Sequence, residues 1–351
     1  MAKKDLCFWN KLPKPFFALA PMANVTDSVF RKIIAKYGKP DVMWTEFVSA
    51  DGLISAGKKK LLIDLEYSNK ERPIVAQLFT GHSEVMREAA KMIADLGFDG
   101  LDINMGCPDR AVEKQGGGAA MMKNQELAID VLKVAQEGVG DSKIPVSVKT
   151  RIGYNKVDME WIRTLLEQKL PALTVHLRTR KEMSNAPAHW EIMPEIIKMR
   201  NEISPETVII GNGDVESVED GILKCKKYGC NGAMIGRGIF GKLWLFENIH
   251  EFRSKLRPSR RRQESTFAKR NEDTLSRRGG SDLRLKVMLE HARLFDKTFC
   301  GKKHLKSFAV MKKHIKAYVS GWVGAKELRV KLMETDNLKE VEKVVKEYLS
   351  V

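Results

Sequence analysis

The chain has 351 residues, a length that suits one large domain with a smaller one beside it. Its residues are 43% hydrophobic, 7% aromatic and 30% charged, which is typical of a globular protein and excludes a disordered or collagen-like chain. The net charge of +16, from 61 Lys and Arg against 45 Asp and Glu, makes a polyanion the first partner to consider.

Neither a membrane segment nor a secretory signal is expected. The longest stretch without a charged residue, Pro15–Thr26, has only 12 residues and includes two prolines, too short to cross a bilayer. The first residues hold no apolar run of signal-peptide length, so we expect a cytoplasmic protein. No two of the cysteines form a CxxC pair or stand near a histidine at ligand spacing, so we expect no disulfide framework and no metal site. The cysteines are Cys7, Cys107, Cys225, Cys230 and Cys300.

The positive charge is concentrated near the C-terminus. Residues 253–351 hold 26 Lys and Arg against 12 Asp and Glu, a net charge of +14, which leaves +2 for residues 1–252. This asymmetry favours a nucleic acid as the polyanion, although many basic proteins bind none.

Residues 1–252 alternate short apolar runs with helical patterns, as in a parallel sheet with crossover helices. In Ser83–Leu96, for example, Val85, Ala89, Met92, Ile93 and Leu96 fall on one helical face. Eight runs are predicted as strands: Phe16–Ala20, Val42–Phe47, Pro73–Leu78, Leu101–Asn104, Val146–Lys149, Leu173–His176, Val208–Gly211 and Ala233–Ile235.

Eight strand–helix units in about 250 residues match an α/β fold of the TIM-barrel type, the (β/α)₈ barrel. A doubly wound open sheet alternates in the same way. Polar or glycine-rich clusters follow nearly every predicted strand, however, and a closed barrel gathers all such ends on one face. We therefore predict a TIM barrel over residues 1–252.

The rest of the chain has a different character. Residues 253–280 are rich in Lys and Arg and poor in apolar residues, so they are predicted as a basic linker or insertion. Residues 281–351 contain four helical apolar patterns separated by short breaks, which predict a small C-terminal helical bundle.

Two polar residues end predicted strands, where a barrel carries its chemistry. Lys149 could reach a ligand, or it could simply extend into solvent from a strand end. His176 could donate a hydrogen bond to a bound ring, although a histidine satisfied within the core is the commoner case.

The last two predicted strands end in glycine-rich turns, Gly211–Asp214 and Gly236–Gly238. Glycines let backbone N–H groups approach a phosphate, Arg237 could neutralise it, and barrels often bind phosphate after strands seven and eight. The sequence has neither a GxGxxG fingerprint nor a GxxxxGK[ST] loop, so a mononucleotide fits better than a dinucleotide.

Cys107 follows the fourth predicted strand instead of lying within an apolar run. As an ordinary thiol it would be largely protonated at neutral pH and could donate a proton. It could instead be a nucleophile if a nearby cation lowered its pKa.

Several motifs together resemble the tRNA-dihydrouridine synthases in order and spacing. They are APMANVTDSVFRK, AQLFTG, DINMGCP followed by GGGAAMMK, SVKTRIG, VHLRTR, IIGNGDV and MIGRGIFG, and the tail MKKHIKAYVSGWVGAKELR resembles the family's tRNA-facing helices. The likeness spans the whole barrel and its tail.

The resemblance implies an FMN-dependent enzyme that reduces the C5=C6 bond of a uridine in tRNA, with NAD(P)H as reductant. It implies that Cys107 is the catalytic proton donor to C5 and that residues 281–351 bind tRNA. We also expect the protein to be a monomer. The cofactor would be held by Met22, Gln77, Lys149, His176, Asn212, Asp214, Gly236 and Arg237, and the uridine by Asn104 and Arg178.

The sequence departs from the family at Asn24 and Leu177, where glycines are usual, and at Lys242–Leu243, where an Asn-Pro pair is usual. Two other functions stay open at this point. One is an FMN barrel that reduces a free pyrimidine, for which the basic tail would have no use, and the other is a non-catalytic RNA chaperone.

Overall fold

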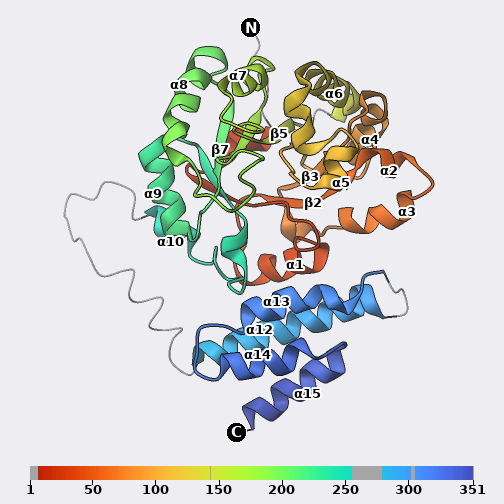
Figure 1. Cartoon of the computed structure of the whole chain (residues 1–351), viewed down its shortest axis with the longest axis vertical. Coiled ribbons are helices and arrows are strands. Elements are labelled where there is room, and N and C mark those ends of the chain that lie inside the picture. The colour runs from red at the N-terminus through yellow and green to blue at the C-terminus, as the bar shows by residue number, and fades with distance from the viewer. Residues whose placement is uncertain (1–6, 143, 255–278, 302–304, 351) are drawn as a thin grey trace, which may run out of the picture. The chain divides into compact units, whose positions relative to one another are not determined.

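The computed structural model describes residues 7–142, 144–254, 279–301 and 305–350 (Figure 1). Contacts divide the chain into two compact units. The first comprises Met1–Ala35 and Lys39–Gly238, and the second comprises Lys36–Gly38 and Ile239–Val351.

The first unit is built on an eight-stranded parallel sheet with the order β1-β8-β7-β6-β5-β4-β3-β2. A parallel bridge between Ala18 and Val42 joins β1 to the chain entering β2, which closes the sheet into a barrel. The predicted TIM barrel is therefore confirmed. The strands are β1 Phe16–Leu19, β2 Met43–Ser49, β3 Ile74–Phe79, β4 Gly100–Met105, β5 Val146–Arg151, β6 Ala172–His176, β7 Val208–Asn212 and β8 Gly232–Ile235.

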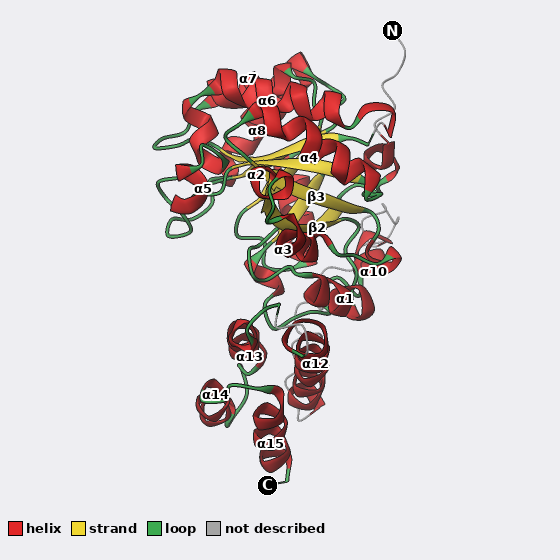
Figure 2. Cartoon of the chain, turned by 90° about the vertical axis from the view of Figure 1, so that its right-hand side faces the viewer, coloured by secondary structure: helices red, strands yellow, loops and turns green. Residues whose placement is uncertain are grey.

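Helices surround these strands, as Figure 2 shows for the yellow strands and the red helices around them. Their bounds are α1 Ser28–Tyr37, α2 Ala50–Ile54, α3 Lys58–Leu61, α4 Ser83–Asp95, α5 Arg110–Lys114, α6 Gln125–Gly138, α7 Met159–Glu167, α8 Met193–Ile203 and α9 Val218–Tyr228. The buried face of α4 differs from the prediction. Met86 and Ala90 are buried, whereas Leu96 is 41% exposed because it caps the helix just before the left-handed turn at Gly97.

An apolar cluster fills the barrel near the N-terminal ends of the strands. It includes Trp9, Phe16, Trp44, Val75 and Ile210, and the Trp9 and Trp44 ring centroids lie 5.8 Å apart. Trp9 belongs to a short 3₁₀ helix, Cys7–Lys11, that precedes β1. Since large side chains occupy this end, polar residues are left to the opposite, C-terminal ends of the strands.

The second unit is helical. Its helices are α10 Ile249–Ser254, α12 Gly279–Phe295, α13 Met311–Tyr318, α14 Ala325–Met333 and α15 Leu338–Leu349, and a π-helical turn, Asp296–Cys300, follows α12. Both views show α12 to α15 lying side by side (Figures 1 and 2), and the buried side chains between them include Phe295, Ile315, Leu332 and Val341. The predicted helical bundle is confirmed.

The predicted basic linker spans residues 253–280, and most of it, residues 255–278, lies outside the described residues. Arg260, Arg261 and Arg262 are in this part. Among the helices that the structure does describe, none has the length and apolar composition needed to cross a membrane.

Candidate functional site

The C-terminal ends of the strands bring the predicted site residues together. Strand register pairs Asn104 of β4 with Lys149 of β5, and Arg151 of β5 with His176 of β6, which in turn pairs with Asn212 of β7. A Cβ atom on Gly236, just after β8, would lie 3.7 Å from Met22 Sδ, after β1. The candidate residues therefore form one continuous rim around the barrel mouth.

A chain of buried hydrogen bonds leads across this rim to Cys107. Asp102 accepts from Gln77 Nε2 at 2.6 Å and from Ser147 Oγ at 2.6 Å, so one carboxylate joins β3, β4 and β5. Gln77 Oε1 accepts from Asn104 Nδ2 at 3.1 Å. Asn104 Oδ1 then accepts from the backbone N–H groups of Gly106 at 3.1 Å and Cys107 at 2.9 Å. Asn104 thus fixes the turn that carries the thiol.

Gly118, the last residue of the glycine run 116–118, packs closely against Cys107. Ala119 N donates to Cys107 O at 2.9 Å, and a Cβ atom on Gly118, where φ is +59°, would stand 2.7 Å from that carbonyl oxygen. Burial raises the pKa of the Cys107 thiol, in competition with the nearby charges of Lys149 and Arg151, which lower it. The group is therefore a protonated thiol at neutral pH, suited to donate a proton.

Lys149 provides a cation inside the mouth. The side chain keeps some exposed surface, but the surrounding protein displaces enough water to lower the pKa of its ammonium group to about 8. Within the part of the chain that the structure describes, this ammonium group has no hydrogen-bond or ion-pair partner. A partly buried ammonium without an acceptor is costly, so this group favours binding of a ligand that supplies one.

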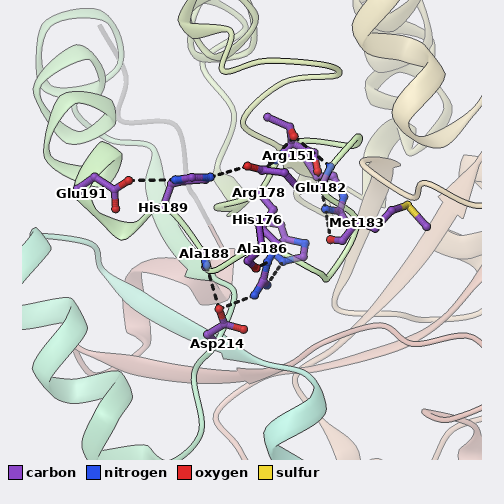
Figure 3. A network of polar contacts seen from close by, with 11 residues as sticks. Arg151, His176, Arg178, Glu182, Met183, Ala186, Ala188, His189, Glu191 and Asp214 are labelled. Carbon is purple, nitrogen blue, oxygen red and sulfur yellow. Dashed lines mark hydrogen bonds and ion pairs between the residues drawn. The ribbon is translucent and has the colours of Figure 1, made fainter.

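His176, Arg178 and Asp214 form a network at the ends of β6 and β7 (Figure 3). Arg178 Nη2 donates to Asp214 Oδ2, and Arg178 Nη1 lies 3.2 Å from His176 Nε2. Burial and the surrounding cations hold the pKa of His176 well below its usual value, so its ring is neutral. Because Nε2 faces a guanidinium donor, it must be the acceptor, which leaves the proton on Nδ1.

Arg178 was expected to face a uridine. Its side chain is only 3% exposed, and its Nε donates to Ala186 O while the guanidinium holds Asp214 and His176. Arg178 therefore joins the loop after β6 to the turn after β7, and its assignment to the uridine stays a prediction.

Asp214 was expected to lie in the phosphate-binding turn, and its position there is strained but well supported. Its φ is +48°, and its carboxylate accepts from Ala188 N at 2.9 Å, from Arg178 and from Arg237 Nη2 at 3.2 Å. Partial burial opposes ionisation, but these donors and charges keep the pKa of Asp214 below its usual range. This carboxylate pairs with Arg237, whose side chain is 62% exposed, and the assignment of both residues to a phosphate stays a prediction.

Arg151 is a site residue that the sequence analysis missed. It is 7% exposed, and its Nε donates to Gly106 O at 2.8 Å. Its Nη1 donates to Thr179 O at 3.0 Å and to Met183 O at 2.9 Å, and Figure 3 labels Arg151 and Met183. Arg151 therefore ties the Cys107 turn to the loop after β6. The available signal was its position two residues after Lys149, which places both side chains on the same side of β5.

Two departures from the family pattern have structural explanations. Asn24 has a φ of +54°, the left-handed conformation that glycine adopts freely and that asparagine tolerates better than most residues. Leu177 is fully buried, and its N–H donates to Asn212 O at 2.9 Å.

The burial of the Asp102 carboxylate predicts how the stability of the protein depends on pH. Burial raises its pKa to about 6, so between pH 6 and its unfolded pKa near 4 the folded state binds more protons than the unfolded state. In D102N an amide group can accept from Gln77 and donate to Ser147 without any charge. Relative to D102N, the wild type should gain up to about 3 kcal/mol of stability as pH falls from 7.5 to 4, measured by denaturant unfolding.

The charge-matched control is D130N, which removes an exposed carboxylate from α6. The difference in unfolding free energy between the wild type and D130N should not change over this pH range. If the difference in unfolding free energy between the wild type and D102N stays constant over the same pH range, the pKa of Asp102 is not raised in the folded protein.

Comparison with known proteins agrees with this geometry. The family described as "Dihydrouridine synthase (Dus)" matches residues 18–350. A "Probable tRNA-dihydrouridine synthase" of Staphylococcus aureus (strain COL) is 36% identical over 344 residues, which cover 97% of this chain and 95% of that protein. A "Probable tRNA-dihydrouridine synthase 2" of Bacillus subtilis (strain 168) is 37% identical over 344 residues, covering 97% and 96%.

Among solved structures, a complex of 2-naphthoyl-CoA reductase aligns with a TM-score of 0.53 at 11% identity, covering 71% of this chain and 52% of that one, a likeness of fold alone. The match over nearly the whole chain, together with the two relatives, shows that this protein belongs to the dihydrouridine synthase family.

Proposed function

We propose that the protein is an FMN-dependent tRNA-dihydrouridine synthase that uses NAD(P)H as reductant. The observation that carries the proposal is the protonated thiol of Cys107, held at the barrel mouth by the hydrogen-bonded chain from Asp102 through Gln77 and Asn104. The family match and the names of the two relatives support the reaction and its RNA substrate.

The residues at the mouth fit a flavin. The ammonium of Lys149 lacks an acceptor among the described residues, and His176 has a free ring proton on Nδ1 by the argument above. A Cβ atom on Gly236 would meet nothing closer than 3.6 Å, so backbone there can be approached closely. Met22, Lys149 and His176 would contact the ring system, while Gln77, which has no exposed surface, would support it by holding Asn104.

The phosphate would lie at the turns after β7 and β8. Gly213 has a φ of +118° and lies against His176, and Arg237 extends from the next turn with Asp214 behind it. Asn212 Nδ2 donates to Met234 O at 2.8 Å, which joins the two strand ends. Asn212 and Asp214 would hold the turns, while backbone N–H groups and Arg237 meet the phosphate.

When bound and reduced, the flavin supplies a hydride to C6 of the uracil ring. The chain's own task is to orient that ring and to protonate C5. Asn104 and Arg151 hold the Cys107 turn on both sides, so the thiol proton has a defined position. Lys149 and Arg151 would stabilise the negative charge left on the sulfur.

The first functional prediction concerns Cys107. In C107A, reduction of the flavin by NAD(P)H should be nearly unchanged, because that step does not use the thiol. Reduction of uridine in tRNA should slow by about a hundredfold or more, the usual scale for a general acid. The two half-reactions are followed separately, by flavin absorbance and by dihydrouridine content.

C300A is the matched control, since Cys300 lies in the helical unit and is also a free thiol. It should leave both half-reactions intact. Wild-type turnover of tRNA by C107A would remove the thiol from the mechanism, and rapid reduction of free uridine without RNA would favour the small-molecule alternative.

The second functional prediction concerns retention of the cofactor. R237A should weaken FMN binding by about 1 to 3 kcal/mol, the range for a hydrogen bond to a charged group. Equilibrium dialysis of the flavin measures the change. R163A removes a half-exposed arginine from α7, whose ion-pair partner among the described residues is Glu160 of the same helix, and should bind FMN normally. Equal affinities for R237A and R163A would contradict the phosphate assignment.

The third functional prediction concerns RNA. We infer that residues 281–351 carry a large share of the backbone contacts, since this segment holds an excess of Lys over acidic residues. Substituting Lys312, Lys313 and Lys316 of α13 with alanine should lower tRNA affinity. It should also reduce the number of counterions released on binding, which the salt dependence of the affinity measures, by up to about three. Filter binding at several salt concentrations measures both.

A charge-matched control on α15 replaces Lys339, Lys343 and Lys346. If both triple variants lose tRNA affinity to the same extent, the contacts depend on total charge and not on α13. If neither variant loses affinity, the barrel or residues 255–278 must carry the RNA.

A further inference from the structure

Two cysteines outside the proposed active site lie in direct contact. Cys225 is in the last turn of α9, Cys230 lies two residues before β8, and their sulfur atoms are 3.4 Å apart. Both residues are largely buried, at 5% and 7% exposure. The mechanism proposed above uses neither thiol.

We propose that Cys225 and Cys230 form a reversible redox pair, which a hydroperoxide oxidises to an intramolecular disulfide joining the end of α9 to the start of β8. The sequence alone gave no indication of it, because the four residues between the cysteines match no CxxC motif.

The geometry requires only a small movement. A disulfide has an S–S length of about 2.05 Å, so the sulfur atoms must approach by about 1.4 Å. The chain after Cys230 is firmly held, since Asn231 N donates to Ile209 O at 2.9 Å and Asn231 Oδ1 accepts from Ile209 N at 2.8 Å. Cys225 lies one turn from an exposed cap, Gly229, with a φ of +82°. We therefore expect the last turn of α9 to make the adjustment.

The surroundings of the two sulfur atoms set the order of reaction. The hydrogen bond with Cys225 lowers the pKa of Cys230 against the opposing effect of burial, and backbone N–H groups including those of Gly211 and Gly232 lower it further. The same contact, with burial and the charge on its neighbour, raises the pKa of Cys225. Cys230 is therefore the thiol of the pair that ionises more readily, and we expect its thiolate to react first.

The proposed oxidation balances in two steps. The Cys230 thiolate attacks one oxygen of the hydroperoxide, the O–O bond breaks, and hydroxide leaves, so that sulfur becomes a sulfenic acid. The Cys225 thiol gives its proton to that hydroxide, and its sulfur then attacks the sulfenic sulfur. The S–O bond breaks, and the departing hydroxide takes up from solvent the proton that Cys230 released on ionising, which gives a second water. The thiols lose two electrons to the peroxide, and a dithiol reductant reverses the change.

The test uses the full-length protein with its cofactor, treated with hydrogen peroxide, alkylated and digested with trypsin. Cleavage after Lys224, Lys226 and Lys227 separates the two cysteines into different peptides. We expect these peptides to be recovered joined, about 2 Da lighter than their sum because two hydrogen atoms are lost. Dithiothreitol should restore alkylation of both.

Single variants test the order of attack. In C225S, peroxide with dimedone should label Cys230, because its sulfenic acid has no partner thiol. In C230S, Cys225 should remain unlabelled and open to alkylation on unfolding. C300S, which alters a thiol in the other unit, should form the joined peptides as the wild type does.

Digestion of the wild type needs no substitution, so a variant that fails to fold leaves the main test intact. The proposal is overturned if peroxide sufficient to oxidise free dithiothreitol leaves both cysteines alkylatable, since the pair would then be an apolar contact. It is also overturned if Cys230 is recovered joined to Cys107 or Cys300, or if dimedone labels Cys225 in C230S.

Discussion

The buried carboxylate of Asp102 is the interaction on which the barrel mouth depends. It has no exposed surface, and burying a carboxylate is costly unless hydrogen bonds satisfy it. Gln77 of β3 and Ser147 of β5 do so from either side, so the three strands must keep one register. Once Gln77 is held, it fixes Asn104, and Asn104 fixes the Cys107 turn. One desolvated charge thus determines where the thiol lies.

A second constraint is the excess of positive charge around the mouth. Lys149, Arg151, Arg178 and Arg237 all act on His176, and together with burial they keep it neutral. Asp214 neutralises part of this charge through Arg178 and Arg237. The remaining positive potential favours an anionic ligand at the rim, as a flavin phosphate or an RNA backbone would provide. Retention of the proposed cofactor and approach of the proposed substrate would therefore draw on one electrostatic feature.

The sequence predicted the architecture well and the contacts within the site poorly. Strand starts were placed within one residue, because apolar runs bounded by polar turns are a local pattern. The ion pair of Arg178 with Asp214, 36 residues away, could not be inferred from spacing. Arg151 was missed for the same reason, since the carbonyl of Gly106 that it holds is 45 residues distant. Folding decides such pairings.

The protonation state of Cys107 illustrates how folding sets chemistry. Lys149 and Arg151 both favour the thiolate, so exposure to water beside these cations would yield a nucleophile. Burial opposes them and prevails. Gly118 allows the chain to pack against Cys107, since a Cβ atom there would stand 2.7 Å from the Cys107 carbonyl oxygen. Burial thus keeps the proton that the proposed reaction would transfer, while the same two cations could stabilise the thiolate that results.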